Sequence, residues 1–87
     1  MAKVEVYSTN YCPYCMRAKA LLKRKGVTFE EIDVTYEPEL RAEMVERSGG
    51  RRTVPEIFIN GKIIGGCDEL YLLEETGELD ELLAQPA

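Results

Sequence analysis

Histidine is absent from the sequence, and cysteine occurs only three times among the 87 residues. Without histidine the chain has no Cys–His or Ser–His catalytic pair, and any metal site would have to use thiolates and carboxylates. Basic residues are also scarce, because 11 lysines and arginines stand against 16 acidic residues and give a net charge of −5. Since a nucleic-acid surface is basic, we expect no nucleic-acid partner.

Long apolar runs are missing as well. The longest one is Leu70–Leu73, whereas a helix that spans a bilayer needs about 20 apolar residues. The N-terminal segment lacks the apolar core of a signal peptide, because an alternating pattern follows Lys3 at once. An odd number of cysteines also fits poorly with a secreted disulfide scaffold. We therefore expect a cytoplasmic, reducing setting and no membrane contact.

What remains is the composition of an ordinary soluble domain, with 45% hydrophobic and 31% charged residues. This balance excludes a disordered or collagen-like chain. The length predicts one domain over residues 1–87, which we expect to act as a monomer. A chain this short buries only about 60–65% of its unfolded surface, so its core must be small.

Hydrophobic periodicity predicts four strands and three helices. The strands are predicted at residues 3–8, 27–34, 56–59 and 62–64. The helices are predicted at residues 14–25, between Pro38 and Ser48, and over a final stretch after Gly65-Gly66 with apolar residues at 70, 73, 79, 82 and 83. A break in the alternation at Glu30-Glu31 suggests a bulge, and Asn60-Gly61 between two apolar runs is the strongest short signal of a hairpin.

The order of the predicted elements is β-α-β-α-β-β-α. The first β-α-β unit requires a right-handed crossover between parallel strands, and the hairpin adds an antiparallel pair. These features predict an α/β domain with a thioredoxin-like fold, in which helices flank a four-stranded mixed sheet.

Two cysteines form a C-x-x-C motif, Cys12-Pro13-Tyr14-Cys15, between the first strand and the first helix. Pro13 suits the first helical position, so Cys12 should be the N-cap, where free N–H groups and the helix dipole favour a thiolate. Cys15 falls on the apolar side of the helix and should be shielded. An exposed thiolate beside a shielded thiol suits thiol–disulfide exchange, with Cys12 attacking and Cys15 resolving. The alternatives are a buried structural pair, or two ligands of a zinc site for which only Cys67 remains as a further thiol.

Three segments together resemble the glutaredoxin family: the C-P-Y-C motif at residues 12–15, Thr53-Val54-Pro55, and Gly65-Gly66-Cys67-Asp68. The resemblance is to the small bacterial dithiol members and covers residues 3–83. It implies a glutathione-dependent thiol–disulfide oxidoreductase with Cys12 and Cys15 as catalytic residues and with Pro13 and Tyr14 in the active-site loop. Glutathione would be a co-substrate, and disulfide-containing or glutathionylated proteins would be the partners. No bound cofactor and no metal are implied.

The resemblance also implies a glutathione site. Pro55 would follow a cis peptide bond, which leaves the backbone groups of Val54 free to pair with an extended peptide. Backbone N–H groups near Cys67 would take the γ-glutamyl carboxylate, and Asp68 would both bind the ammonium and cap the helix. The implied set of glutathione-binding residues is Arg41, Thr53, Val54, Pro55, Gly66, Cys67 and Asp68.

The glycine carboxylate is the least determined part of this site. Family members commonly place a lysine three residues before the first cysteine, where this chain has Thr9. Arg41 matches a second family position, on the second helix, and Arg51 or Arg52 would be substitutes. The role of Cys67 stays open among a spectator, a glutathionylation target and a partner in a dimer disulfide.

Two other functions are compatible with parts of the pattern. A glutaredoxin-like reductant of ribonucleotide reductase, recycled by thioredoxin reductase, would lack a glutathione site; Thr9 favours it, whereas Arg41 and Asp68 disfavour it. A binding module that bridges an Fe–S cluster through Cys12 would use thiolate ligands. Pro13 and Cys15 disfavour the cluster, because proline stiffens the loop and a second thiol competes by closing a disulfide.

Overall fold

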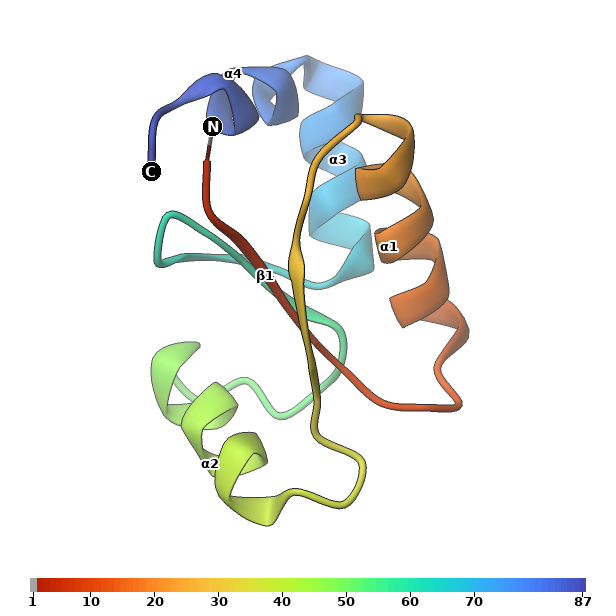
Figure 1. The fold of residues 1–87 in the computed structure, drawn as a ribbon, viewed down its shortest axis with the longest axis vertical. Helices are drawn as coiled ribbons and strands as arrows, with labels where there is room; N and C mark the ends of the chain where they lie inside the picture. Colours follow the sequence, from red (N-terminus) through yellow and green to blue (C-terminus); the bar gives the residue numbers. More distant parts are fainter. Residues whose placement is uncertain (1) are drawn as a thin grey trace.

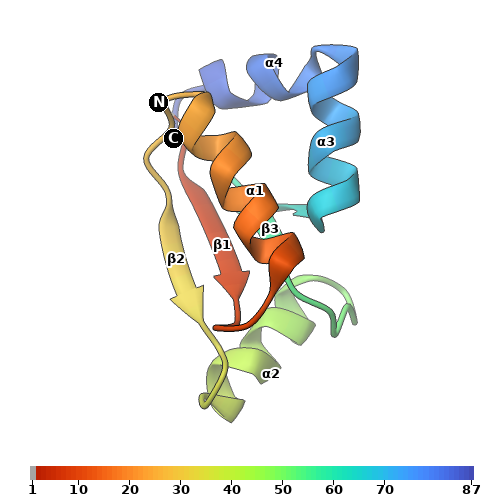
Figure 2. The same ribbon diagram turned by 90° about the vertical axis from the view of Figure 1, so that its right-hand side faces the viewer.

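The computed structural model describes residues 2–87 and contains one mixed sheet with helices on both of its faces (Figures 1 and 2). The elements in chain order are β1 (Val4–Ser8), α1 (Pro13–Arg24), β2 (Glu30–Asp33), α2 (Pro38–Arg47), β3 (Glu56–Ile59), β4 (Lys62–Gly65), α3 (Cys67–Thr76) and α4 (Glu78–Ala84). The strand order is β2-β1-β3-β4, with β1 parallel to β2 and the other two pairings antiparallel. The predicted four-stranded mixed sheet flanked by helices is confirmed.

Each face of the sheet has its own small core, because successive side chains of a strand point to opposite faces. Val4 and Val6 of β1 belong to a cluster with buried residues of α1, α3 and α4. Tyr7 and Phe58 belong to a second cluster with Met44 of α2. In Figure 2, α1 and α3 lie on one side of the strands, and α2 lies below the ends of β1 and β2.

The predicted bulge in the second strand is wrong. The pairing of β1 with β2 is continuous from Glu5 opposite Glu30 to Ser8 opposite Asp33. The alternation breaks there for another reason. Because β2 is an edge strand, Glu31 can occupy a position where alternation predicts an apolar residue, and its carboxylate accepts hydrogen bonds from Ser8 and Lys19. An irregularity of this kind lies elsewhere, between Ile57 and Phe58 where β3 pairs with β4.

The final helical stretch is divided, so the described chain has four helices where the sequence predicted three. Gly77 adopts φ 82°, a left-handed conformation that ends α3 and precedes α4. Figure 2 shows α4 running across the end of α3. This turn brings Leu79 to full burial in the same cluster as Leu70 of α3.

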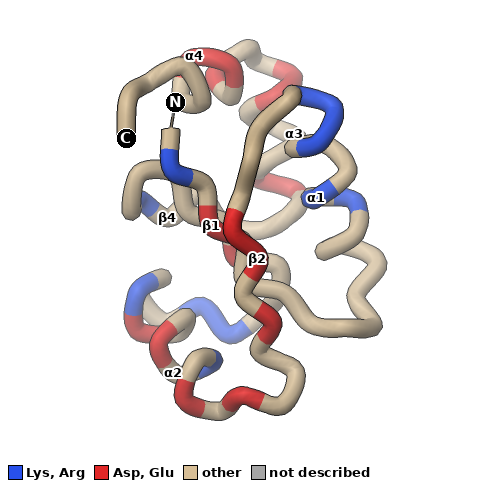
Figure 3. The backbone as a smooth tube through the Cα atoms, viewed as in Figure 1, with Lys and Arg blue, Asp and Glu red and all other residues tan. Residues whose placement is uncertain are grey.

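Charged residues are unevenly distributed along the fold (Figure 3). Lys23 and Arg24 occupy the last turn of α1, where cations interact favourably with the helix dipole. A second basic segment, Arg51-Arg52, lies between α2 and β3. None of the helices within residues 2–87 has the length and apolarity needed to cross a membrane.

Candidate active site

Cys12 occupies the N-cap of α1, as the sequence predicted. Its backbone is extended, Pro13 follows at the start of the helix, and its Sγ accepts the backbone N–H of Cys15 at 3.1 Å. The residue is less exposed than predicted, at 9% of its surface, because the carbonyl oxygen of Val54 lies 3.8 Å from Sγ.

Cys15 is the shielded thiol of the pair, with 1% of its surface exposed. Burial, followed by hydrogen bonding with the Cys12 side chain, raises the pKa of Cys15 to about 12. The thiol therefore keeps its proton at neutral pH in the reduced form. All three cysteines are free thiols in this structure.

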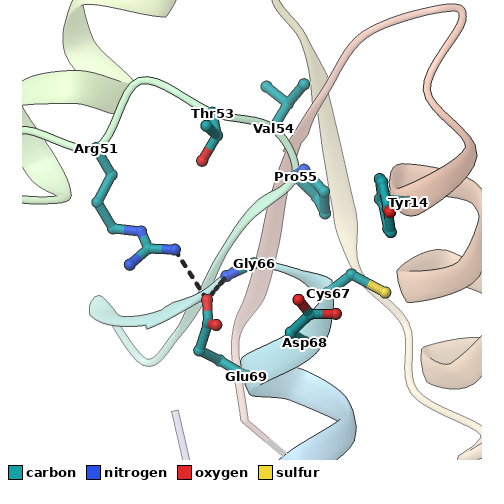
Figure 4. A pocket seen from close by; sticks show the side chains of 9 residues that line it. All are labelled: Tyr14, Arg51, Thr53, Val54, Pro55, Gly66, Cys67, Asp68 and Glu69. Atoms are coloured by element: carbon teal, nitrogen blue, oxygen red, sulfur yellow. Dashed lines mark hydrogen bonds and ion pairs between the residues drawn. The ribbon is translucent and has the colours of Figure 1, made fainter.

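A cavity of about 260 Å³ lies where the three predicted segments meet (Figure 4). Tyr14 lies at one end of it, the segment 53–55 forms one wall, and the start of α3 forms the other. The Val54–Pro55 peptide bond is cis, as the resemblance implied. The lining residues are Tyr14, Arg51, Thr53, Val54, Pro55, Gly66, Cys67, Asp68 and Glu69. Six of the seven residues proposed for glutathione are thus gathered around one space.

Arg41 is the exception. It lines a separate hollow beside α2, together with Arg52, and its Nη2 donates to the carbonyl oxygen of Arg52 at 3.3 Å. The basic residue that lines the cavity near Cys12 is Arg51. The sequence named Arg51 only as a substitute, because an arginine in a loop has no periodic pattern that would place it.

Asp68 does not cap α3, contrary to the expectation. Gly66 is the N-cap, and its N–H donates to Oε1 of Glu69 at 2.6 Å. The reason is the position along the helix, since a side chain reaches back to the N-cap backbone from the third helical residue, which is Glu69, and not from the second. Asp68 is left exposed at the mouth of the cavity.

A network of hydrogen bonds that the sequence analysis missed joins the two walls of the cavity. Glu56 is fully buried, and its carboxylate accepts from Arg51 Nε at 2.9 Å and from Thr53 Oγ1 at 3.0 Å. Arg51 Nη2 donates in turn to Glu69 Oε1 at 2.8 Å (Figure 4). Glu69 stands three residues after Gly66, the spacing from which a glutamate can accept the N-cap N–H, and this could have revealed it, whereas no local pattern marks Glu56.

Cys67 lies between this cavity and a second hollow lined by Arg17, Asp68 and Tyr71. Only 6% of its surface is exposed, and burial, aided by the Asp68 carboxylate, raises the pKa of its thiol. Cys67 is therefore a neutral thiol at physiological pH. Within residues 2–87 no three cysteine, aspartate or glutamate side chains gather in a way that would hold a metal ion.

Comparison with known proteins agrees with this geometry. The glutaredoxin family model matches residues 4–64. The chain belongs to the glutaredoxin family. Glutaredoxin 3 of Escherichia coli K12 is 55% identical over 83 residues, which are 95% of this chain and 99% of that protein. A glutaredoxin of Pseudomonas aeruginosa is 54% identical over 84 residues, with 97% of this chain and 99% of that protein covered.

Solved glutaredoxin structures share the fold. The solution structure of glutaredoxin from Brucella melitensis has a TM-score of 0.83 at 60% identity and covers 95% of this chain and 89% of its own. The crystal structure of a buckwheat glutaredoxin–glutathione complex has a TM-score of 0.86 at 35% identity, over 94% of this chain and 76% of its own. Family and fold support thiol–disulfide oxidoreductase activity, and the Cys12–Cys15 pair fits the redox-active centre.

Proposed function

We propose that the chain is a glutathione-dependent thiol–disulfide oxidoreductase, which reduces protein disulfides and protein–glutathione mixed disulfides. The observation that supports this most directly is the position of Cys12. Its Sγ accepts an N–H at the start of α1 and lies 3.8 Å from Val54 O, on a wall of the cavity. A nucleophilic sulfur is thus placed beside a space in which a peptide can bind. The related buckwheat protein was solved in complex with glutathione.

In the monothiol route, the Cys12 thiolate attacks the glutathione sulfur of a glutathionylated protein. A Cys12–glutathione disulfide forms and the protein leaves as its thiolate, which takes up a proton. The thiolate of a second glutathione then attacks the glutathione sulfur of this mixed disulfide, releases Cys12 and leaves as glutathione disulfide. The route consumes one free glutathione for each protein thiol released, because the other half of the glutathione disulfide comes from the substrate.

In the dithiol route, Cys12 attacks a protein disulfide and forms a mixed disulfide with it. Cys15 loses its proton and attacks Cys12 Sγ, which forms the Cys12–Cys15 disulfide and releases the second thiolate of the substrate. Two molecules of glutathione then restore the dithiol. The buried position of Cys15 behind Cys12 suits a thiol that acts only after the first attack.

We propose that glutathione lies in the cavity between Thr53-Val54-Pro55 and the start of α3. The backbone of Val54 would pair with the peptide, and Asp68 would bind the ammonium group. Among the lining residues Arg51 is the cation available to a carboxylate, and it takes precedence over Arg41, which lies outside the cavity. We further propose a single-domain monomer that works in the cytoplasm with no bound cofactor or metal.

The test is turnover of a glutathionylated small disulfide with glutathione, glutathione reductase and NADPH. We expect Cys12→Ser to be inactive, because the attacking sulfur is lost, and Cys15→Ser to keep activity through the monothiol route. A protein disulfide should require both cysteines. Activity in Cys12→Ser would contradict the mechanism. A native chain that is inactive with glutathione and active with thioredoxin reductase would instead favour the reductant of ribonucleotide reductase.

A further inference from the structure

Glu69 projects into the cavity between its two walls (Figure 4). One oxygen of its carboxylate, Oε1, accepts the backbone N–H of Gly66 at 2.6 Å and Arg51 Nη2 at 2.8 Å. A guanidinium and a backbone N–H are the groups that recognise carboxylates in proteins. The protein's own carboxylate therefore holds two donors that also border the space proposed for the ligand.

The two ends of Arg51 are held very differently. Its Nε is bonded to Glu56, whose side chain is fully buried, so breaking this contact would leave a buried charge without a partner. Its Nη2 is bonded to Glu69, and both of these side chains are about 43–44% exposed. Exposed ion pairs contribute little free energy, so an incoming anion can displace Glu69 while Glu56 keeps Arg51 in place.

Because of the charges around the cavity, the contact between Arg51 and Glu69 should affect the binding of anionic ligands. Among the nine described residues that line it, Arg51 is the one cation, whereas Asp68 and Glu69 are acidic. A ligand carboxylate that approaches Arg51 must compete with Glu69, and it also meets the negative charge of Glu69 itself. Glutathione, with two carboxylates and one ammonium group, is such a ligand.

We propose that Glu69 is a specificity-determining residue that competes with the substrate's carboxylate for Arg51, and that it thereby weakens the binding of anionic ligands. This inference rests on the proposed function, because it concerns the same cavity. Competition and structural support predict opposite changes in affinity when Glu69 is replaced. If Glu69 only held the two walls of the cavity together, its loss would weaken ligand binding, whereas loss of a competitor strengthens it.

The variant that separates the two roles is Glu69→Gln. Glutamine keeps the shape, and its side-chain oxygen can still accept the Gly66 N–H, while the charge is removed. The control is Glu75→Gln on the same helix, at an exposed position outside the cavity. Thermal unfolding of both variants establishes that α3 is intact.

Binding is measured by calorimetry with S-methylglutathione and with its diester, which keeps the ammonium and lacks both carboxylates. We expect Glu69→Gln to bind S-methylglutathione about fivefold more tightly, the size of an exposed ion pair. The diester should bind with unchanged or lower affinity, and Glu75→Gln should behave as the native chain. In an Arg51→Gln background the gain from Glu69→Gln should disappear, because the contested donor is gone.

Weaker or unchanged binding of S-methylglutathione to Glu69→Gln would overturn the inference, as would an equal gain for the diester. Failure of both the native chain and Glu69→Gln to bind at all would overturn it too. Calorimetry needs no turnover, so these outcomes are distinct from the loss of glutathione-dependent activity that would overturn the proposed function.

Discussion

Cys15 must lose its proton before it can attack, and its burial makes this difficult. Burial, the largest cause of the raised pKa of Cys15, persists when Cys12 is joined to glutathione, so the thiolate fraction of Cys15 should increase steadily with pH between pH 6 and 9. We expect the rate at which a Cys12–glutathione disulfide releases glutathione in a single turnover to rise with pH in the same way. Rapid mixing and quenching measures this rate. Cys15→Ser, without added thiol, should release none. A rate that levels off below pH 7 would contradict this account of Cys15.

Single residues could be placed from the sequence where a local rule applies. Pro13 marks the start of a helix, and that alone places Cys12 at the N-cap. Arg41 and Glu56 obey no such rule, because what they contact depends on how α2 and β3 pack in space. Arg41 turned away to the carbonyl of Arg52, and Glu56 proved to be buried beneath the candidate site.

Element type was easier to predict than element boundaries, since periodicity reports on burial over several residues. The Asn60-Gly61 turn is confirmed, with φ of 52° and 79° between β3 and β4. The edge strand β2 is shorter than predicted, and the last helix is split. The split arises at Gly77, whose left-handed conformation ends α3, and the wrongly predicted bulge arises because Glu31 of the edge strand pairs with Lys19.

The junction between β4 and α3 depends on the absence of a side chain at Gly65. This residue has φ 118°, and a Cβ there would lie 2.6 Å from Glu69 Oε1. We expect Gly65→Ala to lower the free energy of unfolding by about 2–3 kcal/mol, through backbone strain and loss of the cap. Gly77→Ala is the matched control, because its φ is also positive and nothing lies within 4 Å. Urea unfolding should show a smaller loss for Gly77→Ala, and equal losses would mean that the contact with Glu69 is unimportant.

At the scale of the whole molecule, the cluster between the sheet and α2 is the part of the core that is harder to predict from the sequence. Alternation in Val4-Glu5-Val6-Tyr7 predicts a strand, and it places Glu5 and Tyr7 on the side of the sheet opposite Val4 and Val6. In the structure that side is covered, and Glu5 is 8% exposed. Arg47 of α2 binds Glu5 and Tyr7 and stacks over Phe58 at 4.2 Å. An ion pair thus completes an apolar cluster too small to cover the sheet alone.

The stability of the whole molecule should therefore depend on pH through Glu5. The hydrogen bond from Arg47, the largest cause, holds the pKa of Glu5 below its ordinary value. A carboxyl group with a depressed pKa stabilises the fold above its unfolded pKa of about 4.3, and the stabilisation is lost as the pH falls through the folded pKa.

We expect Glu5→Gln to lower the free energy of unfolding by about 1–2 kcal/mol at pH 7. At pH 3 the difference between native chain and variant should be smaller, because the stabilisation by ionised Glu5 declines below its unfolded pKa and is lost as the pH falls through its lowered folded pKa. Urea unfolding at the two pH values measures this difference, with the exposed Glu46→Gln on α2 as the control. A difference that persists undiminished at pH 3 would mean that Glu5 acts through packing and not through its charge.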